Sequence, residues 1–211
     1  MLKKNKHDGF FGGLYKRNET FLIIATAMFL VSMFAGYAFA GYLDTVMGAL
    51  LGDLKRRLTT GELKITTSSI FLNNIRVAFL IYGTGAVLGI FTSIFLIING
   101  TLLGYAAAKY PLGTFIIFTV PHGIPEILGI LIAATAGFRL ASFVLHVLKD
   151  SLDIRSDLPF LKQLRYIIGI NADEFWDSVK LFAITVVLLI IAAFIEANLS
   201  IPWGMYVQSV L

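Results

Sequence analysis

The sequence predicts an all-α fold: a polytopic bundle of about five transmembrane helices, accompanied by interfacial amphipathic helices. The 211 residues are 57% hydrophobic and only 14% charged, with a mean hydropathy of +0.82, whereas soluble domains carry about 25% charged residues. Several uncharged runs are also long enough to cross a hydrocarbon core, which takes about 20 residues. The length suits one compact domain, and the absence of cysteine excludes disulfides and thiolate chemistry.

The first expected element is a basic cytoplasmic tail at residues 1–18, whose cations are Lys3, Lys4, Lys6, Lys16 and Arg17. The uncharged run from Thr20 to Leu43 follows at once and is too long for the apolar region of a cleavable signal peptide. Because Lys and Arg collect on the cytoplasmic side of membranes, the tail is interpreted as a topogenic flank rather than a nucleic-acid site. Residues 19–203 are expected to form a single transmembrane domain, and 204–211 a C-terminal tail.

An interfacial amphipathic segment is expected at about residues 44–72. Its apolar side chains recur at helical spacing while charged residues occupy the other side, a pattern typical of a helix lying in the membrane interface. The apolar residues are Met47, Leu50, Leu51, Leu54 and Leu58. Interfacial anchoring is favoured over specific binding of anionic lipid.

The middle of the chain is expected to contain two spans. No charge occurs from Val77 to Ala108, a run too long for one ordinary span. The Asn99-Gly100 dipeptide is a turn signal, so spans are placed at about residues 74–98 and 101–120. The second of these is expected to be interrupted around Lys109, Pro111 and Gly113.

A fourth span is expected from about residue 121 to Leu145, and a fifth between Trp176 and Trp203. The two tryptophans are separated by about 40 Å of helix at 1.5 Å per residue, which matches a bilayer with its headgroups. A second interfacial segment is expected at about residues 149–172. Five spans place the basic loop before the fifth span in the cytoplasm, in agreement with the positive-inside trend.

Small residues repeat at four-residue spacing and predict close contacts between helices. They are Gly85, Gly89, Gly100, Gly104, Gly129, Ala133 and Gly137. Exposed faces of this kind also suit a homodimer.

Polar residues at membrane depth are costly and usually functional, and Pro121-His122-Gly123-Ile124-Pro125-Glu126 places two of them in an apolar run. One interpretation is structural: a helix beginning near Pro125, with Glu126 facing the unsatisfied amides of its first turn. The other is a polar cluster inside the bundle, in which Arg76 pairs with Glu126. Its expected members are Asn73, Asn74, Arg76, Asn99, Lys109, His122 and Glu126.

No metal, cofactor or catalytic residue is expected. His122 and Glu126 supply two ligands, whereas zinc takes three or four, and an enzyme would need a third ligand or an activated nucleophile beside His122. The sequence contains no HExxH, GxSxG, Walker A or dinucleotide-binding motif. Lys109 would either line a polar passage or mark a kink beside Pro111, and Glu196 is expected to snorkel or to contact Asn198.

Five short motifs are also informative: Asn73-Asn74-Ile75-Arg76-Val77-Ala78-Phe79, Gly83 to Gly89, Ile98-Asn99-Gly100-Thr101-Leu102-Leu103-Gly104, Pro121 to Glu126, and Ala136-Gly137. Together they resemble the stage II sporulation protein M family of integral membrane proteins, over about residues 18–200. The Asn-Gly and Pro-His-Gly-x-x-Glu elements are the specific parts. The resemblance implies a membrane location and a scaffold role, because the family's namesake works with a peptidoglycan hydrolase and another membrane protein during engulfment in spore-forming bacteria.

The sequence therefore favours a non-enzymatic scaffold that organises partner proteins or lipids in the cell envelope, in the cell membrane and with a cytoplasmic N-terminus. The alternative is a transporter or channel with a polar site around Glu126, Arg76, His122 and Lys109, and an intramembrane enzyme is the weakest hypothesis. A water-accessible cavity lined by those four residues would favour transport, and a closed cluster would favour the scaffold. The expected partners are the lipid bilayer, other membrane proteins and a second copy of the chain, but not nucleic acid.

Overall fold

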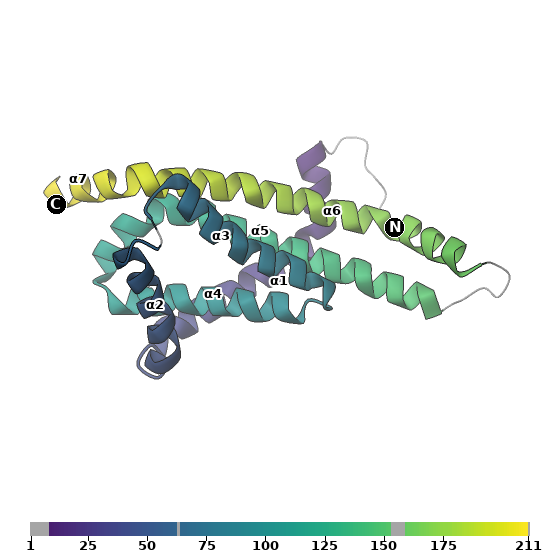
Figure 1. The fold of residues 1–211 in the computed structure, drawn as a ribbon, viewed down its shortest axis with the longest axis horizontal. Coiled ribbons are helices and arrows are strands. Elements are labelled where there is room, and N and C mark those ends of the chain that lie inside the picture. Colours follow the sequence, from purple (N-terminus) through teal and green to yellow (C-terminus); the bar gives the residue numbers. More distant parts are fainter. Residues whose placement is uncertain (1–8, 63, 153–158, 211) are drawn as a thin grey trace.

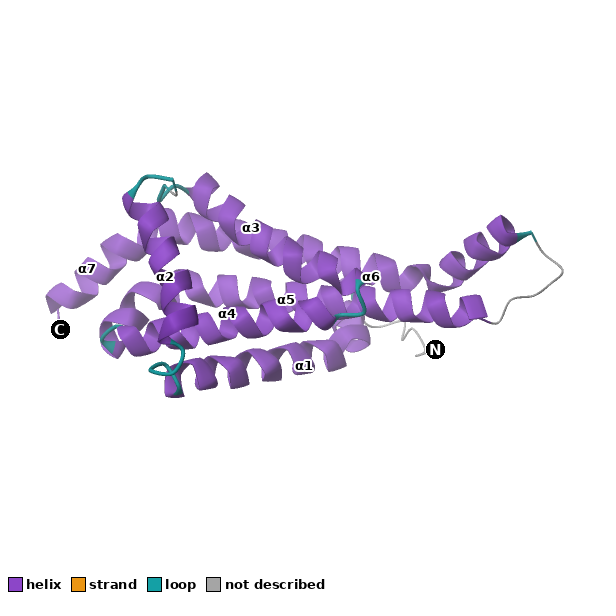
Figure 2. Ribbon diagram, turned by 60° about the horizontal axis from the view of Figure 1, so that its bottom comes forward, coloured by secondary structure: helices purple, strands orange, loops and turns teal. Residues whose placement is uncertain are grey.

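The predicted all-α membrane-type fold is confirmed. A computed structural model describes residues 9–62, 64–152 and 159–210 and contains no strand in those ranges (Figure 2). Its helices are α1 (Phe10–Ala38), α2 (Asp44–Thr59), α3 (Thr67–Gly83), the 3-10 turn η1 (Thr84–Ala86), α4 (Ile90–Lys109), α5 (Leu112–Leu152), α6 (Phe160–Ile195), the π-helix η2 (Glu196–Ser200) and α7 (Ile201–Val210). Among the described residues, four helical segments are long and apolar enough to cross a membrane: α1, α4, α5, and the continuous run from α6 to α7.

The bundle is organised around the antiparallel pair α5 and α6, which lie side by side over most of their lengths (Figures 1 and 2). Helix α1 packs mainly on α4, and α3 lies against both α5 and α6. With 17 residues, α3 is slightly shorter than an ordinary span. The chain passes along the bundle in α1, α3, α4, α5 and α6; four segments are long and apolar enough to cross a membrane, compared with the prediction of about five spans.

The predicted turn at Asn99-Gly100 is wrong, because α4 continues through it. The chain turns instead between Gly83 and Gly89, where α3 ends and η1 follows. Gly89 has a φ of 75°, a conformation that is accessible to glycine because it has no Cβ. Gly100 serves a different purpose, since a Cβ there would lie 2.7 Å from the Phe29 carbonyl oxygen of α1.

The predicted helix start at Pro125 is also wrong. Helix α5 runs without interruption through Pro121 and Pro125, which membrane helices tolerate when neighbouring groups satisfy the freed carbonyls. The interruption expected around Pro111 does occur, but it separates α4 from α5 instead of breaking one span.

The two interfacial segments differ in outcome. The expected helix at the start of 44–72 is present as α2, in which Met47 is the buried residue, although α3 already begins at Thr67. The segment expected at 149–172 consists instead of the ends of α5 and α6, with residues 153–158 outside the described ranges. Of the expected tails, α1 already covers residues 10–18 and α7 extends to 210, while residues 1–8 are not described.

Small residues allow backbones to meet inside the bundle. A Cβ on Gly36, Gly100 or Gly104 would collide with backbone or side-chain atoms across the α1–α4 contact. A Cβ on Gly85 would collide with the backbone of Gly137 in α5, and one on Gly129 would lie 3.1 Å from Leu189 in α6. Ala133 is completely buried. The helices of the core therefore pack with their backbones close to one another.

Candidate functional site

Three ionisable side chains meet where α5 passes the end of α6. They are His122 and Glu126 of α5 and Glu196 of η2, and one ligand atom from each lies within 4.8 Å of the others. All three side chains are partly buried. The cluster therefore contains one imidazole and two carboxylates.

The local backbone explains how the cluster forms. His122 and Glu126 are four residues apart in the continuous helix α5, so they lie on one face. Glu196 begins the π-helix and Ser200 ends it, and the wider π turn presents both residues toward α5. Such π-bulges recur at functional sites.

A hydrogen bond fixes the orientation of His122. Its Nδ1 lies 2.8 Å from the Ser200 Oγ, and the Ser200 hydroxyl donates to the Ile195 carbonyl at 3.3 Å. A hydroxyl has only one proton to donate, so with that proton on the Ile195 carbonyl it is Nδ1–H that donates to Ser200. The other ring nitrogen, Nε2, then keeps a free lone pair.

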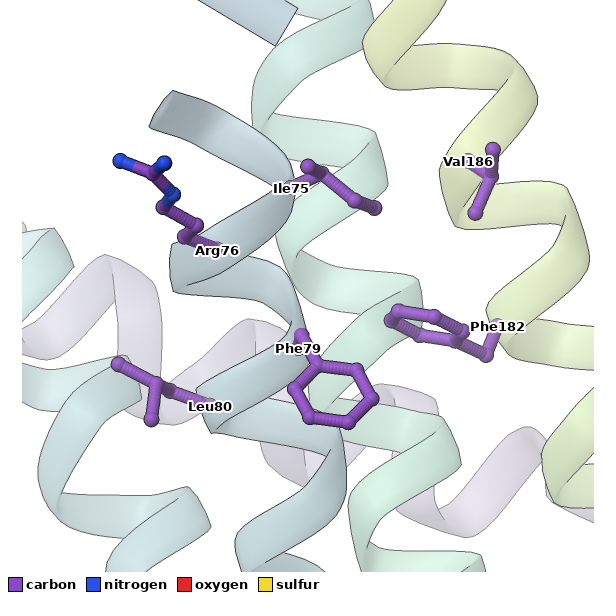
Figure 3. A pocket seen from close by; sticks show the side chains of 6 residues that line it. All are labelled: Ile75, Arg76, Phe79, Leu80, Phe182 and Val186. Carbon is purple, nitrogen blue, oxygen red and sulfur yellow. The ribbon is translucent and has the colours of Figure 1, made fainter. Parts of the chain in front are cut away.

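The two carboxylates have no cationic partner. In the parts of the chain that the structure describes, neither Glu126 nor Glu196 forms a hydrogen bond or an ion pair. The hypothesis that Arg76 pairs with Glu126 is wrong in this structure. Arg76 is exposed on α3 and lines a depression of about 540 Å³ between α3 and α6. Figure 3 shows its guanidinium directed away from Phe182 and Val186 on the other side of that depression.

Lys109 interacts with Asp44 and not with the cluster. Its Nζ lies 2.5 Å from the Asp44 Oδ1 at the start of α2, and the Tyr105 hydroxyl donates to the same oxygen at 2.7 Å. The hydrogen bonds from Lys109 and Tyr105 hold the pKa of Asp44 below its ordinary value. Lys109 therefore stabilises the contact between α2 and α4.

The predicted asparagines make mostly local hydrogen bonds. Asn99 donates to the Phe95 carbonyl of its own helix at 2.8 Å, and Asn73 donates to the Asn74 side chain at 3.4 Å. The expected seven-residue cluster is therefore divided among several places, with only His122 and Glu126 brought together at the α5–η2 contact.

Sequence reasoning missed a second polar region, near the middle of α6. Arg17 of α1 donates to both carboxylate oxygens of Asp177, at 2.6 and 2.9 Å, and the Asp177 side chain is only 2% exposed. One turn away, Glu174 accepts from Ser142 at 3.0 Å and lies 3.6 Å from Arg139. The signal available in the sequence was a pair of acids three residues apart on one face of a helix.

Comparisons with known proteins identify one matching family and two similar proteins. The family described as Stage II sporulation protein M matches residues 25–201, a range that contains the whole His122–Glu126–Glu196 cluster. The chain is 32% identical to the uncharacterized protein MJ0793 of Methanocaldococcus jannaschii over 137 residues, 63% of this chain and 69% of that protein. It is 24% identical to the uncharacterized protein MJ0706 of the same organism over 199 residues, 87% of this chain and 83% of that protein. No solved structure matches the chain.

Proposed function

The chain belongs to the stage II sporulation protein M family, and on that premise we propose that this membrane protein is a non-enzymatic scaffold. It organises partner proteins or lipids in the cell envelope and resides in the cell membrane. The partners are other membrane proteins, with a second copy of the chain among the candidates.

The observation that carries this proposal is the length of the α5–α6 hairpin. Helix α5 has 41 residues, about 62 Å at 1.5 Å per residue, whereas a hydrocarbon core is about 30 Å thick. Helix α6 has 36 residues and runs alongside it. The two helices extend together beyond α1, α3 and α4 (Figures 1 and 2). A membrane-spanning bundle with this shape presents a helical hairpin outside the bilayer.

The surface of the projecting hairpin suits protein contacts. Leu152, Leu161 and Tyr166 are 85%, 76% and 67% exposed, and apolar side chains exposed to water favour burial against a partner. Lys149 and Lys162 lie on the same projection. Because cytoplasmic segments collect basic residues, we propose that the hairpin lies on the cytoplasmic side of the membrane. We propose the same side for the N-terminal end of α1.

The interior of the bundle supports a scaffold over a channel. The buried Asp177 pairs with the partly exposed Arg17, and the pair of Lys109 with Asp44 is exposed at the surface, so these pairs do not form a continuous charged path through the bundle. Glycine-mediated contacts also keep the helices close together. Transport remains the second candidate, supported by the unpaired His122–Glu126–Glu196 cluster.

Site-specific photo-crosslinking in native membranes tests the proposal. A photoreactive residue replaces Tyr166 at the hairpin, and the matched control replaces Phe34, which is 70% exposed on α1. The expected result is a discrete protein adduct at position 166 and mainly lipid adducts at position 34. Absence of a protein adduct at 166, together with solute flux by the purified protein in liposomes, would favour the transporter.

A further inference from the structure

We propose that His122, Glu126 and Glu196 form a binding site for one divalent transition-metal ion, with Zn²⁺ as the matching probe. The site joins α5 to the π-helix at the end of α6. This inference does not depend on the scaffold proposal, because it rests only on the ligand set and its surroundings.

The positions of the ligand atoms are close to those that a metal ion requires. Zinc binds imidazole nitrogen and carboxylate oxygen at about 2.0–2.2 Å, so two ligands on one ion are separated by roughly 3–4 Å. The three candidate atoms already lie within 4.8 Å of one another. Binding of one ion therefore requires the three side chains to move closer together.

The hydrogen bonding of His122 is that of a metal ligand. Metal-bound histidines commonly donate their second ring N–H to a fixed oxygen, which sets the tautomer and the ring orientation. Ser200 supplies that oxygen, because its own proton is directed to Ile195. The free lone pair on Nε2 is therefore available to an ion.

The charge of the site also favours a cation. Glu126 and Glu196 lie close together in segments that are long and apolar enough to cross a membrane, and no Lys or Arg in the described residues pairs with either of them. Two carboxylates in this setting repel each other and lose solvation. A divalent ion neutralises both of them. The imidazole favours zinc-like ions over Mg²⁺ or Ca²⁺, which prefer sites made entirely of oxygen.

The donor set leaves one coordination position open. Three protein ligands account for three of the four positions of tetrahedral zinc, and water commonly fills the fourth. Once bound, the ion would link residues more than 70 positions apart, His122 and Glu196, and so hold the π-helix against α5.

Metal content of the purified full-length protein provides the test. Tag-free protein in lipid nanodiscs is stripped with a chelator, loaded with Zn²⁺ and assayed for bound metal and for affinity by titration calorimetry. Wild type is expected to bind one Zn²⁺ per chain. His122→Ala, Glu126→Gln and Glu196→Gln are expected to lose that ion, and Ser200→Ala to weaken binding by about 10–100-fold.

Two variants serve as matched controls. His146→Gln and Glu62→Gln remove a histidine and a glutamate outside the cluster, and both are expected to retain one Zn²⁺ with unchanged affinity. Zinc X-ray absorption of the loaded wild type needs no variant, and it should show nitrogen and oxygen ligands, with imidazole, at about 2.0–2.2 Å.

Three results would overturn the proposal. They are a wild type that binds no Zn²⁺, cluster variants that bind it as wild type does, and an absorption spectrum without imidazole. If wild type binds no Zn²⁺ and Glu126→Gln raises the Tm, the two carboxylates repel each other without a bound ion and the cluster is not a metal site.

Discussion

Substituting Gly104 by alanine tests whether backbone contact between α1 and α4 holds the bundle together. A Cβ at this position would collide with the Met33 carbonyl oxygen and would lie 2.8 Å from the Met33 carbonyl carbon and 2.9 Å from the Tyr37 nitrogen. All three are backbone atoms of α1, so no side-chain rotation relieves the collision. The two helices must move apart, which also loosens the neighbouring contact of Gly100.

Two opposing terms determine the change in stability. Overpacking a well-packed contact costs about 1–3 kcal/mol, and alanine in a helix interior is favoured over glycine by about 0.5–1 kcal/mol. Because the obstructing atoms are backbone, the cost is expected near the upper end of its range. We therefore expect Gly104→Ala to lower the free energy of unfolding by about 1–2 kcal/mol, combining those two ranges.

Thermal unfolding in one detergent, followed by tryptophan fluorescence, measures this change. For a chain of this size, 1 kcal/mol corresponds to about 2–4 °C in Tm, so a fall of about 2–8 °C is expected. The matched control is Gly169→Ala in α6, where a Cβ would meet nothing within 4 Å and the Tm should rise slightly. A Gly104→Ala protein as stable as the Gly169→Ala protein would refute the reasoning.

Three further predictions concern charged groups. Asp177→Asn is expected to lower the free energy of unfolding by about 2–3 kcal/mol. This is less than the loss of about 3–5 kcal/mol that is typical of a fully buried pair, because Arg17 is 37% exposed. A loss below about 0.5 kcal/mol in thermal unfolding would contradict this expectation. The pKa of Asp44 is lowered by its bond with Lys109, so its stabilising contribution is complete above the unfolded value of about 3.9 and is lost as the pH falls through the folded pKa. The Tm of wild type should therefore fall more steeply toward pH 3 than that of Asp44→Asn, and parallel curves would exclude this contribution. Arg56→Ala should change stability by less than about 0.5 kcal/mol, because its ion pairs are exposed; a loss above about 1 kcal/mol by the same assay would show that α2 depends on them.

Composition was sufficient to predict the fold class, because a chain this apolar must satisfy its backbone groups internally within lipid. Helix boundaries were harder to predict, since glycine and proline have different uses in membranes and in water. Asn99-Gly100 reads as a turn in a soluble protein, yet Gly100 lies inside α4 and lets α1 approach. Pro125 reads as a first helical residue, yet it lies well inside α5.

Two of the three residues of the candidate site were predictable. His122 and Glu126 interrupt an apolar run, so their cost at membrane depth drew attention to them. Glu196 was missed because its approach to α5 depends on a π-helix. No residue pattern in the sequence predicts that π-helix. The pairing of Arg76 with Glu126 was inferred from similar depth alone, and depth does not determine which face of a helix a residue occupies.

The α1–α4 contact has a consequence for biosynthesis. Gly36 of α1 meets Thr101 of α4, so the two contacting helices are separated by roughly 65 residues, which take about 3–13 s to synthesise at 5–20 residues per second. Helix α1 therefore enters the membrane well before the helix that covers its small-residue face. During that interval lipid, an insertion factor or a neighbouring nascent chain occupies the face, and α4 must displace this occupant before the bundle can close.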